Sequence, residues 1–211
     1  ARMSASPKRA LIVIDVQNEY FIGNLRIEYP DVGVSLPNIA RAMDAAQAAA
    51  IPVVVIQHLE APDSPLFARG GEMAELHPEI ARRPSDHHVE KNQASALTGT
   101  DLAAWLRDRQ IDTLTVVGYM THNCDLATAL EAHHLGWKVE LLHDASGSLP
   151  YSNACGSASA EEIHRVMTVV MHSSFAAVAS TRQWLAALES GTALEPGDIP
   201  SSNQRALAER R

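Results

Sequence analysis

Short runs of aliphatic, mostly β-branched residues recur along this chain, and they constrain its fold more than any other feature. The clearest are Ala10–Ile14, Val53–Ile56, Thr113–Val117 and Val139–Leu142. Runs that are apolar at nearly every position, rather than at alternate positions, predict strands covered on both faces, as in a parallel sheet. A weaker candidate strand is Phe175–Ala179, and a further one lies near Val169.

The segments between these runs have the residue spacing of helices. Leu36–Ala50 is rich in alanine, with Pro37 in what would be its first turn. The other predicted helices are Asp101–Arg109, Cys124–His134 and a segment that begins with the capping-box pair Ser159 and Glu162. Because strands and helices alternate, we expect a three-layer α/β/α sandwich around a mainly parallel, Rossmann-like sheet of roughly six strands.

Two segments depart from this alternation. Residues 57–100 show little periodicity and many Pro, Gly and His residues, and they follow the carboxyl end of a predicted strand, where open α/β sheets bind ligands. Residues 190–211 are polar and lack a core-forming pattern. We therefore expect one domain over residues 1–189 and a polar C-terminal tail or arm over 190–211. A neighbouring subunit would hold such an arm in place, and crystal packing would do so equally well.

Composition narrows the class of protein. The 211 residues include 17 basic and 25 acidic side chains, for a net charge of −8, which argues against a general nucleic-acid binder. Only two cysteines occur, so a disulfide framework is not expected. Residues 1–9 do not resemble a secretion signal, and no apolar run is long enough for a membrane helix. We expect a cytoplasmic protein with a small-molecule substrate and no nucleic-acid or membrane partner.

Cys124 is the first candidate for chemistry. It follows the predicted strand Thr113–Val117 and a short turn, at the start of a predicted helix. Free N–H groups at a helix N-terminus stabilise a thiolate and could bind the oxyanion of an acyl-transfer reaction. A buried, inert thiol is the commoner role of a lone cysteine, so both interpretations stay open at this point.

Asp15 and Lys91 are the other candidates. Asp15 ends the first predicted strand, where partial desolvation would raise its pKa and suit it to proton transfer, although it could equally cap the following turn. Lys91 lies in the long segment that should overhang the same edge. A cation there would hold Asp15 ionised and help to keep Cys124 a thiolate, but most lysines are solvated surface groups.

Metal and nucleotide sites have little support. The histidines include two adjacent pairs rather than a spaced ligand set such as HExxH. The glycines form neither a GxGxxG motif nor a P-loop. We therefore expect no metal and no other cofactor.

Three motifs, in this order, resemble those of the isochorismatase-like cysteine hydrolases. Ala10–Phe21 (ALIVIDVQNEYF) resembles the opening strand and turn of that family. Val89–Ala94 (VEKNQA) resembles its lysine segment, and Gly118–Asp125 (GYMTHNCD) resembles its nucleophile segment. The similarity runs from about Ala10 to Leu188.

The resemblance implies a catalytic triad of Asp15, Lys91 and Cys124. Cys124 would attack a carbonyl carbon to form a thioester, Asp15 would accept the thiol proton, and Lys91 would balance the charge. The resemblance also implies a cis peptide bond between Tyr119 and Met120. The backbone N–H groups of Met120 and Cys124 would then form the oxyanion hole.

Two departures from the family pattern narrow the implied activity. Nicotinamidases of the family carry an Asp-x-His metal motif after the second strand, where this chain has Gln57–Ala61 (QHLEA). True isochorismatases lack the nucleophilic cysteine. The resemblance therefore implies a metal-independent hydrolase of a C–N bond in a small amide, ureide, carbamoyl compound or lactam. An ester or thioester hydrolase, a non-catalytic metabolite-binding protein and a redox sensor remain alternatives.

Further side chains on the same edge are expected to contact substrate. They are Gln17, Tyr20, Phe21, Tyr119, Asn123 and Tyr151. Phe21 could equally belong to the core, and Asn123 could cap the helix that follows it. Because the family commonly forms dimers or larger rings, we also expect a homo-oligomer.

Overall fold

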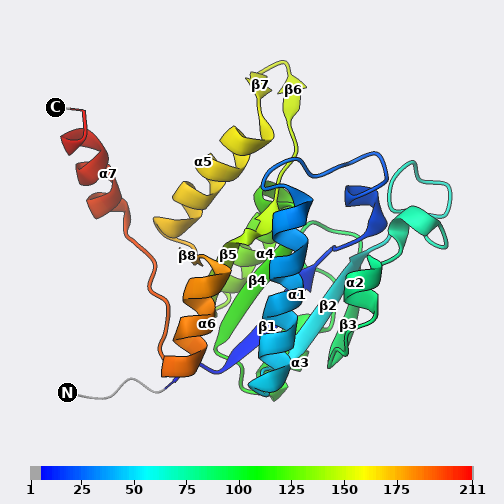
Figure 1. The fold of residues 1–211 in the computed structure, drawn as a ribbon, viewed down its shortest axis with the longest axis horizontal. Helices are drawn as coiled ribbons and strands as arrows, with labels where there is room; N and C mark the ends of the chain where they lie inside the picture. Colours follow the sequence, from blue (N-terminus) through cyan, green and yellow to red (C-terminus); the bar gives the residue numbers. More distant parts are fainter. Residues whose placement is uncertain (1–5, 211) are drawn as a thin grey trace.

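The four aliphatic runs predicted as strands form the centre of a six-stranded sheet in the computed structural model, which describes residues 6–210 (Figure 1). The strand order is β3-β2-β1-β4-β5-β8, and every adjacent pair is parallel. The strands are β1 (Arg9–Ile14), β2 (Val53–His58), β3 (His87–Lys91), β4 (Thr113–Tyr119), β5 (Lys138–Gly147) and β8 (Ala177–Ala179).

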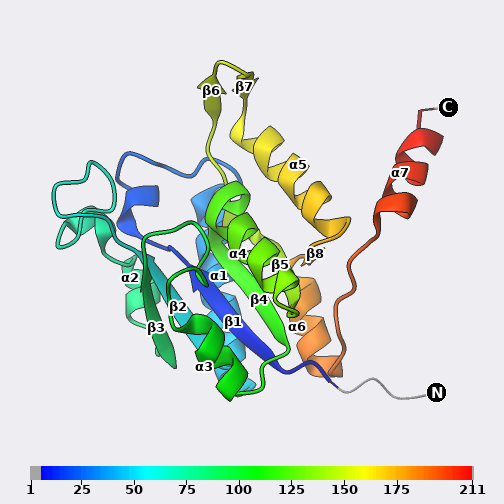
Figure 2. The same ribbon diagram turned by 180° about the vertical axis from the view of Figure 1, so that it is seen from behind.

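Helices cover both faces of the sheet, so the predicted three-layer architecture is confirmed (Figures 1 and 2). One face carries α1 (Val32–Ala48) and α6 (Thr181–Ser190), and the other carries α3 (Leu102–Asp108), α4 (Leu126–His134) and α5 (Ala160–His172). The remaining elements are the short helices η1 (Asn18–Tyr20), η2 (Glu72–Ala74) and α2 (Pro78–Ala81), the π-helical turn η3 (Thr121–Asp125), the hairpin β6 (Tyr151–Asn153) and β7 (Gly156–Ala158), and α7 (Ile199–Ala208).

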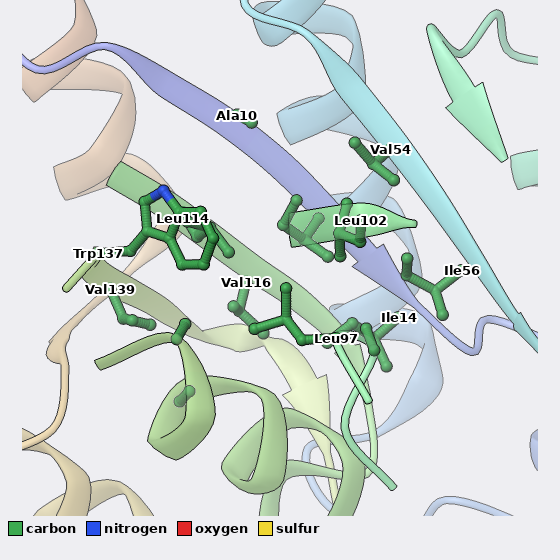
Figure 3. Packing of buried hydrophobic residues seen from close by; sticks show 14 of the residues in the cluster. Ala10, Ile14, Val54, Ile56, Leu97, Leu102, Leu114, Val116, Trp137 and Val139 are labelled. Carbon is green, nitrogen blue, oxygen red and sulfur yellow. The ribbon is translucent and has the colours of Figure 1, made fainter. Parts of the chain in front are cut away.

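The central strand β1 contributes to two separate cores because successive side chains of a strand point to opposite faces. Ile12 and Ile14 pack in the core beneath α3 and α4, which Figure 3 shows from close by. Leu11 and Val13 pack in the core beneath α1 and α6. None of these four side chains is accessible to solvent. Burial on both faces explains why the run is apolar at every position.

The prediction that the first helix begins at Leu36 was wrong. In the structure α1 begins at Val32, because the Asp31 side chain accepts a hydrogen bond of 2.7 Å from the N–H of Gly33 and so caps the helix. Pro37 therefore lies inside the helix rather than in its first turn. It removes one backbone hydrogen bond, a loss that a 17-residue helix with a buried face tolerates.

Two strand predictions also need correction. The candidate strand near Val169 is part of α5, because the capping box of Ser159 and Glu162 starts a helix that continues to His172. Conversely, residues 57–100, expected to lack regular structure, contain the edge strand β3. Its buried residues alternate with more exposed ones, and it has no continuous apolar run that could identify it.

The tail was expected to lack a core-forming pattern, and its outer part contains a helix. The carbonyl of Thr192 accepts a hydrogen bond of 2.7 Å from Arg9, and Leu194 packs against the core. The chain then leaves the body and forms α7, whose residues are all exposed (Figures 1 and 2). The outer face of α5 is apolar and exposed as well, notably at Val169. Among residues 6–210, no helix is long and apolar enough to cross a membrane.

The expected homo-oligomer stays a prediction, and α7 offers a direct test of it. An isolated helix of this length is marginal in water, so we expect α7 to be stabilised by a second copy of the chain. Light scattering should give a mass above that of one chain. Leu207→Asp should lower that mass at a given concentration, whereas Gln204→Asp, at another exposed position of α7, should not. A single-chain mass at all concentrations would contradict this expectation.

Candidate active site

Three strands deliver reactive side chains to one point at the carboxyl edge of the sheet. Asp15 follows β1, Lys91 is the last residue of β3, and Cys124 lies in η3, just after β4. The Lys91 Nζ atom lies 2.9 Å from Asp15 Oδ2 and 3.5 Å from Cys124 Sγ. The structure thus brings together the three residues predicted as the triad, and all three are buried.

The backbone at the end of β1 turns sharply to place Asp15. Its φ of 51° lies in the left-handed region, which aspartate tolerates better than most residues, and its N–H donates to the carbonyl of Ile56 at 3.2 Å. On the neighbouring strand, Gly118 has a φ of 109°. A Cβ atom there would collide with the backbone of Ile14, so only glycine allows the two strands to approach so closely at this edge.

Lys91 is positioned by the register of β3 against β2. It pairs with His58, the last residue of β2, so its side chain reaches the sheet edge at the level of Asp15. The ammonium group also contacts the Gln93 carbonyl oxygen at 2.9 Å and His58 Nδ1 at 3.0 Å. Lys91 is therefore the end of an ordered strand and not part of an overhanging loop.

Cys124 lies in a π-helical turn rather than in the first turn of an α-helix, because α4 begins only at Leu126. The carbonyl of Met120 accepts hydrogen bonds from the N–H groups of Asn123 at 3.1 Å and Asp125 at 3.2 Å, on either side of Cys124. The predicted cis bond between Tyr119 and Met120 is present. The assignment of the oxyanion hole to the N–H groups of Met120 and Cys124 stays a prediction.

Burial and charge together set the protonation states of the three side chains. Burial raises the pKa of Asp15, and the nearby charge of Lys91 opposes this only in part. Burial lowers the pKa of Lys91, but its interactions with Asp15 and Cys124 outweigh that effect, so its pKa is raised and it stays an ammonium group. Burial raises the pKa of the Cys124 thiol well above its usual range, the charge of Asp15 raises it further, and Lys91 lowers it.

Lys91 lowers the pKa of the Cys124 thiol, which is the direction expected of a cation that helps to keep it a thiolate. One ammonium group does not offset both the desolvation of the sulfur and the negative charge of Asp15. The resting nucleophile is therefore a thiol that lies beside a carboxylate of raised pKa. Such a pair is arranged to pass a proton from sulfur to carboxylate when a substrate is bound.

Asp125 is a neighbouring group that the sequence analysis missed. Its carboxyl is fully buried, and neither oxygen has a hydrogen-bond partner among residues 6–210. Burial, with the charge of Asp15 added to it, raises the pKa of Asp125 well above its usual range. The raised pKa favours the neutral form of the Asp125 carboxyl, whereas the charge of Lys91 favours the ionised form of Asp15.

Tyr151 and His122 contact each other and are more accessible than the Cys124 thiol. The Tyr151 hydroxyl lies 2.8 Å from His122 Nε2, and His122 Nδ1 lies 3.0 Å from the hydroxyl of Ser148. Burial lowers the pKa of His122 to about 4, so its ring is neutral at physiological pH. Burial raises the pKa of Tyr151, and its hydroxyl lies 4.0 Å from Met120 Sδ, in the turn that leads to Cys124. No residue spacing pointed to His122 as a site residue.

The other five predicted substrate contacts differ in their surroundings. The Gln17 amide is buried and bonds the backbone of His58 and Ala74, with N···O distances of 2.8 to 2.9 Å, so it holds two chain segments together. Tyr20 and Tyr119 are buried in the core. Phe21 is partly buried against aromatic neighbours, and Asn123 is exposed. Substrate contact by any of these residues stays a prediction.

The stretch that corresponds to the nicotinamidase metal motif has a different arrangement here. His58 Nε2 lies 2.6 Å from Glu60 Oε1, and His58 Nδ1 contacts Lys91. Within the part of the chain that the structure describes, no three His, Cys, Asp or Glu side chains gather as a metal site requires.

The parallel sheet thus carries a thiol, a carboxylate and an ammonium group in contact at its carboxyl edge. The chain matches the family model of the isochorismatase domain over residues 9–183. It therefore belongs to the isochorismatase family, a family of hydrolases, as the resemblance implied.

Three comparisons with known proteins describe the similarity further. A crystal structure from Burkholderia xenovorans LB400, provisionally named an isochorismatase, is 64% identical, with a TM-score of 0.96 over 98% of this chain and 99% of that chain. A secreted isochorismatase effector of Verticillium dahliae is 32% identical over 65% of this chain and 71% of that protein. The ureidoacrylate amidohydrolase RutB of Variovorax paradoxus is 30% identical over 66% of this chain and 69% of that protein.

The ion pair between Lys91 and Asp15 allows the effect of two substitutions on stability to be predicted. Lys91→Met removes the cation and leaves the carboxylate of Asp15 buried without a counter-charge, which should lower the free energy of unfolding by about 3–5 kcal/mol. Replacing both partners, as Lys91→Met with Asp15→Leu, should restore part of that loss because no uncompensated charge remains. Urea denaturation of the three proteins measures this. If the free energy of unfolding of Lys91→Met lies within about 1 kcal/mol of that of the parent, the two charges are not coupled.

Proposed function

We propose that this chain is a metal-independent cysteine hydrolase that cleaves a C–N bond of a small amide, ureide, carbamoyl compound or lactam. The observation that supports it most is the buried contact of one ammonium group, Lys91, with both Asp15 and Cys124. Burying two charges beside a thiol carries a desolvation cost that an apolar core would avoid. The similarity to a ureidoacrylate amidohydrolase agrees with C–N chemistry.

The first half of the reaction forms a thioester. Asp15 accepts the proton of the Cys124 thiol as the sulfur attacks the carbonyl carbon, and Lys91 stabilises the negative charge on sulfur as it develops. The carbonyl oxygen becomes an oxyanion that the N–H groups of Met120 and Cys124 would bind. Asp15 then gives its proton to the nitrogen, the C–N bond breaks, and ammonia or an amine leaves.

The second half of the reaction restores the thiol. Asp15, again a carboxylate, takes a proton from a water molecule, and the oxygen of that water attacks the thioester carbon. The C–S bond breaks, the acid is released, and the proton held by Asp15 returns to the sulfur of Cys124. The same carboxylate serves both halves, which fits a pKa that burial raises and so makes Asp15 a better proton acceptor than an ordinary aspartate.

The absence of a metal requirement is supported by the chemistry of the residues at the nicotinamidase motif. There, an Asp-x-His pair would offer a carboxylate and an imidazole to a metal. Here His58 has both ring nitrogens in contact with protein groups, Lys91 on one side and Glu60 on the other. A cationic ammonium group at 3.0 Å from a ring nitrogen also disfavours a second cation at that atom.

A panel of substrates tests the proposed activity. Primary amides, ureides, carbamoyl compounds and lactams are each incubated with the protein, and release of ammonia or amine is measured. Cys124→Ala should abolish turnover, whereas the matched change Cys155→Ala, at an exposed cysteine, should leave it unchanged. Turnover that survives in Cys124→Ala would contradict the mechanism. Faster hydrolysis of matched esters than of amides would favour the ester-hydrolase alternative, and no turnover would favour a binding role.

The pH dependence of kcat/KM follows from Asp15. Only the ionised carboxylate can accept the thiol proton, so activity is present above the pKa of Asp15 and is lost as the pH falls through it. Because burial raises that pKa, the acid limb should lie above the ordinary aspartate value of about 4. Initial rates measured between pH 3 and pH 9 locate the limb. Undiminished activity down to about pH 4 would contradict the assignment of Asp15 as the base.

A further inference from the structure

His58 lies between the site and the protein surface, and the mechanism above does not use it. Its Nδ1 atom is 3.0 Å from Lys91 Nζ, and its Nε2 atom is 2.6 Å from Glu60 Oε1. The ring packs edge-on against Phe67, with the ring centroids 5.2 Å apart. Glu60 is partly exposed, with 40% of its side chain accessible, whereas the histidine side chain is only 14% exposed.

These contacts fix where the hydrogen of the imidazole lies. The Lys91 ammonium group has only hydrogens to offer, so Nδ1 of His58 must accept. The carboxylate of Glu60 can only accept, so Nε2 must carry the hydrogen and donate it. A second proton on the ring would point an N–H group at the ammonium. His58 is therefore held neutral, in one tautomer, from both sides.

The same contacts complete the surroundings of Lys91. An ammonium group has three hydrogens, and Lys91 Nζ has three hydrogen-bond partners: the Gln93 carbonyl oxygen at 2.9 Å, His58 Nδ1 at 3.0 Å and Cys124 Sγ at 3.5 Å. Asp15 Oδ2, 2.9 Å from Nζ, forms the ion pair with the ammonium group. With all three hydrogens engaged, the ammonium group has a fixed place beside the sulfur.

We propose that His58 is a positioning residue for Lys91, an inference that rests on the proposed cysteine-hydrolase function. Its neutral Nδ1 holds the ammonium group where it stabilises negative charge on Cys124, and its ring keeps that group apart from the carboxylate of Glu60. Without an acceptor at Nδ1, one buried ammonium hydrogen is unsatisfied, and Lys91 turns toward Glu60 and away from the sulfur. Glu60 in turn selects the tautomer that accepts from Lys91.

Two substitutions of His58 separate this role from general packing. His58→Asn places an amide oxygen near the position of Nδ1, so the acceptor for Lys91 is kept. His58→Gln places its amide near the position of Nε2 and a methylene group where Nδ1 was, so that acceptor is lost. Both variants are made in a Cys155→Ser background, which leaves Cys124 as the one thiol of the chain.

The readout is the rate at which iodoacetamide alkylates Cys124 at neutral pH. This rate reports the stabilisation of thiolate and needs no substrate, so an error in the proposed substrate class does not affect it. The Asn variant should react within about threefold of the parent, and the Gln variant about tenfold more slowly, as expected for the loss of one hydrogen bond to a charged group. Equal rates in the two variants, whether both high or both low, would overturn this role.

A measurement on the unsubstituted residue covers the case in which a variant does not fold. The ¹⁵N NMR spectrum of the histidine rings distinguishes the two neutral tautomers and the doubly protonated form. At neutral pH the His58 signals, identified by their loss in His58→Asn, should be those of the Nε2–H tautomer. An Nδ1–H tautomer or a doubly protonated ring would overturn the inference.

Discussion

The buried ion pair between Lys91 and Asp15 is the interaction on which the rest of the site depends. Neither side chain has accessible surface, so each charge has lost its hydration, a cost of several kcal/mol per ion. The site recovers part of that cost through the pair itself and through the contacts of Lys91 with His58 and the Gln93 carbonyl. Misplacing any one partner would leave a buried charge uncompensated, so the backbone around the pair must be held accurately.

The parallel sheet provides that accuracy. The two charged residues lie at the ends of β1 and β3, with β2 between them, and the register of His58 opposite Lys91 sets the height of the ammonium group. On the other side, the close approach of Gly118 to β1 brings the turn that carries Cys124 toward Asp15. The resting site therefore holds one ion pair and a neutral thiol. Negative charge on sulfur develops only during reaction, beside a cation already in place.

Much of this arrangement could be predicted from sequence, and the physical reasons for the rest are specific. Strands buried on both faces, such as Ala10–Ile14, leave a continuous apolar run, whereas the edge strand β3 alternates and was missed. The triad was predicted through resemblance to a family, since spacing alone left Cys124 and Asp15 undecided. The contact of His58 with Lys91 and the burial of the Asp125 carboxyl arise from tertiary packing, which no local sequence pattern encodes.

The central claim is that Cys124 carries a covalent acyl intermediate, and mass spectrometry of acid-quenched turnover tests it most directly. Protein mixed with a substrate from the active class is quenched within a few turnovers, digested and mapped. The account predicts an acyl group on the peptide that contains Cys124, in thioester linkage that hydroxylamine removes, and none on Cys155. An acyl group on another residue, or steady turnover with Cys124 unmodified at every quench time, would contradict it.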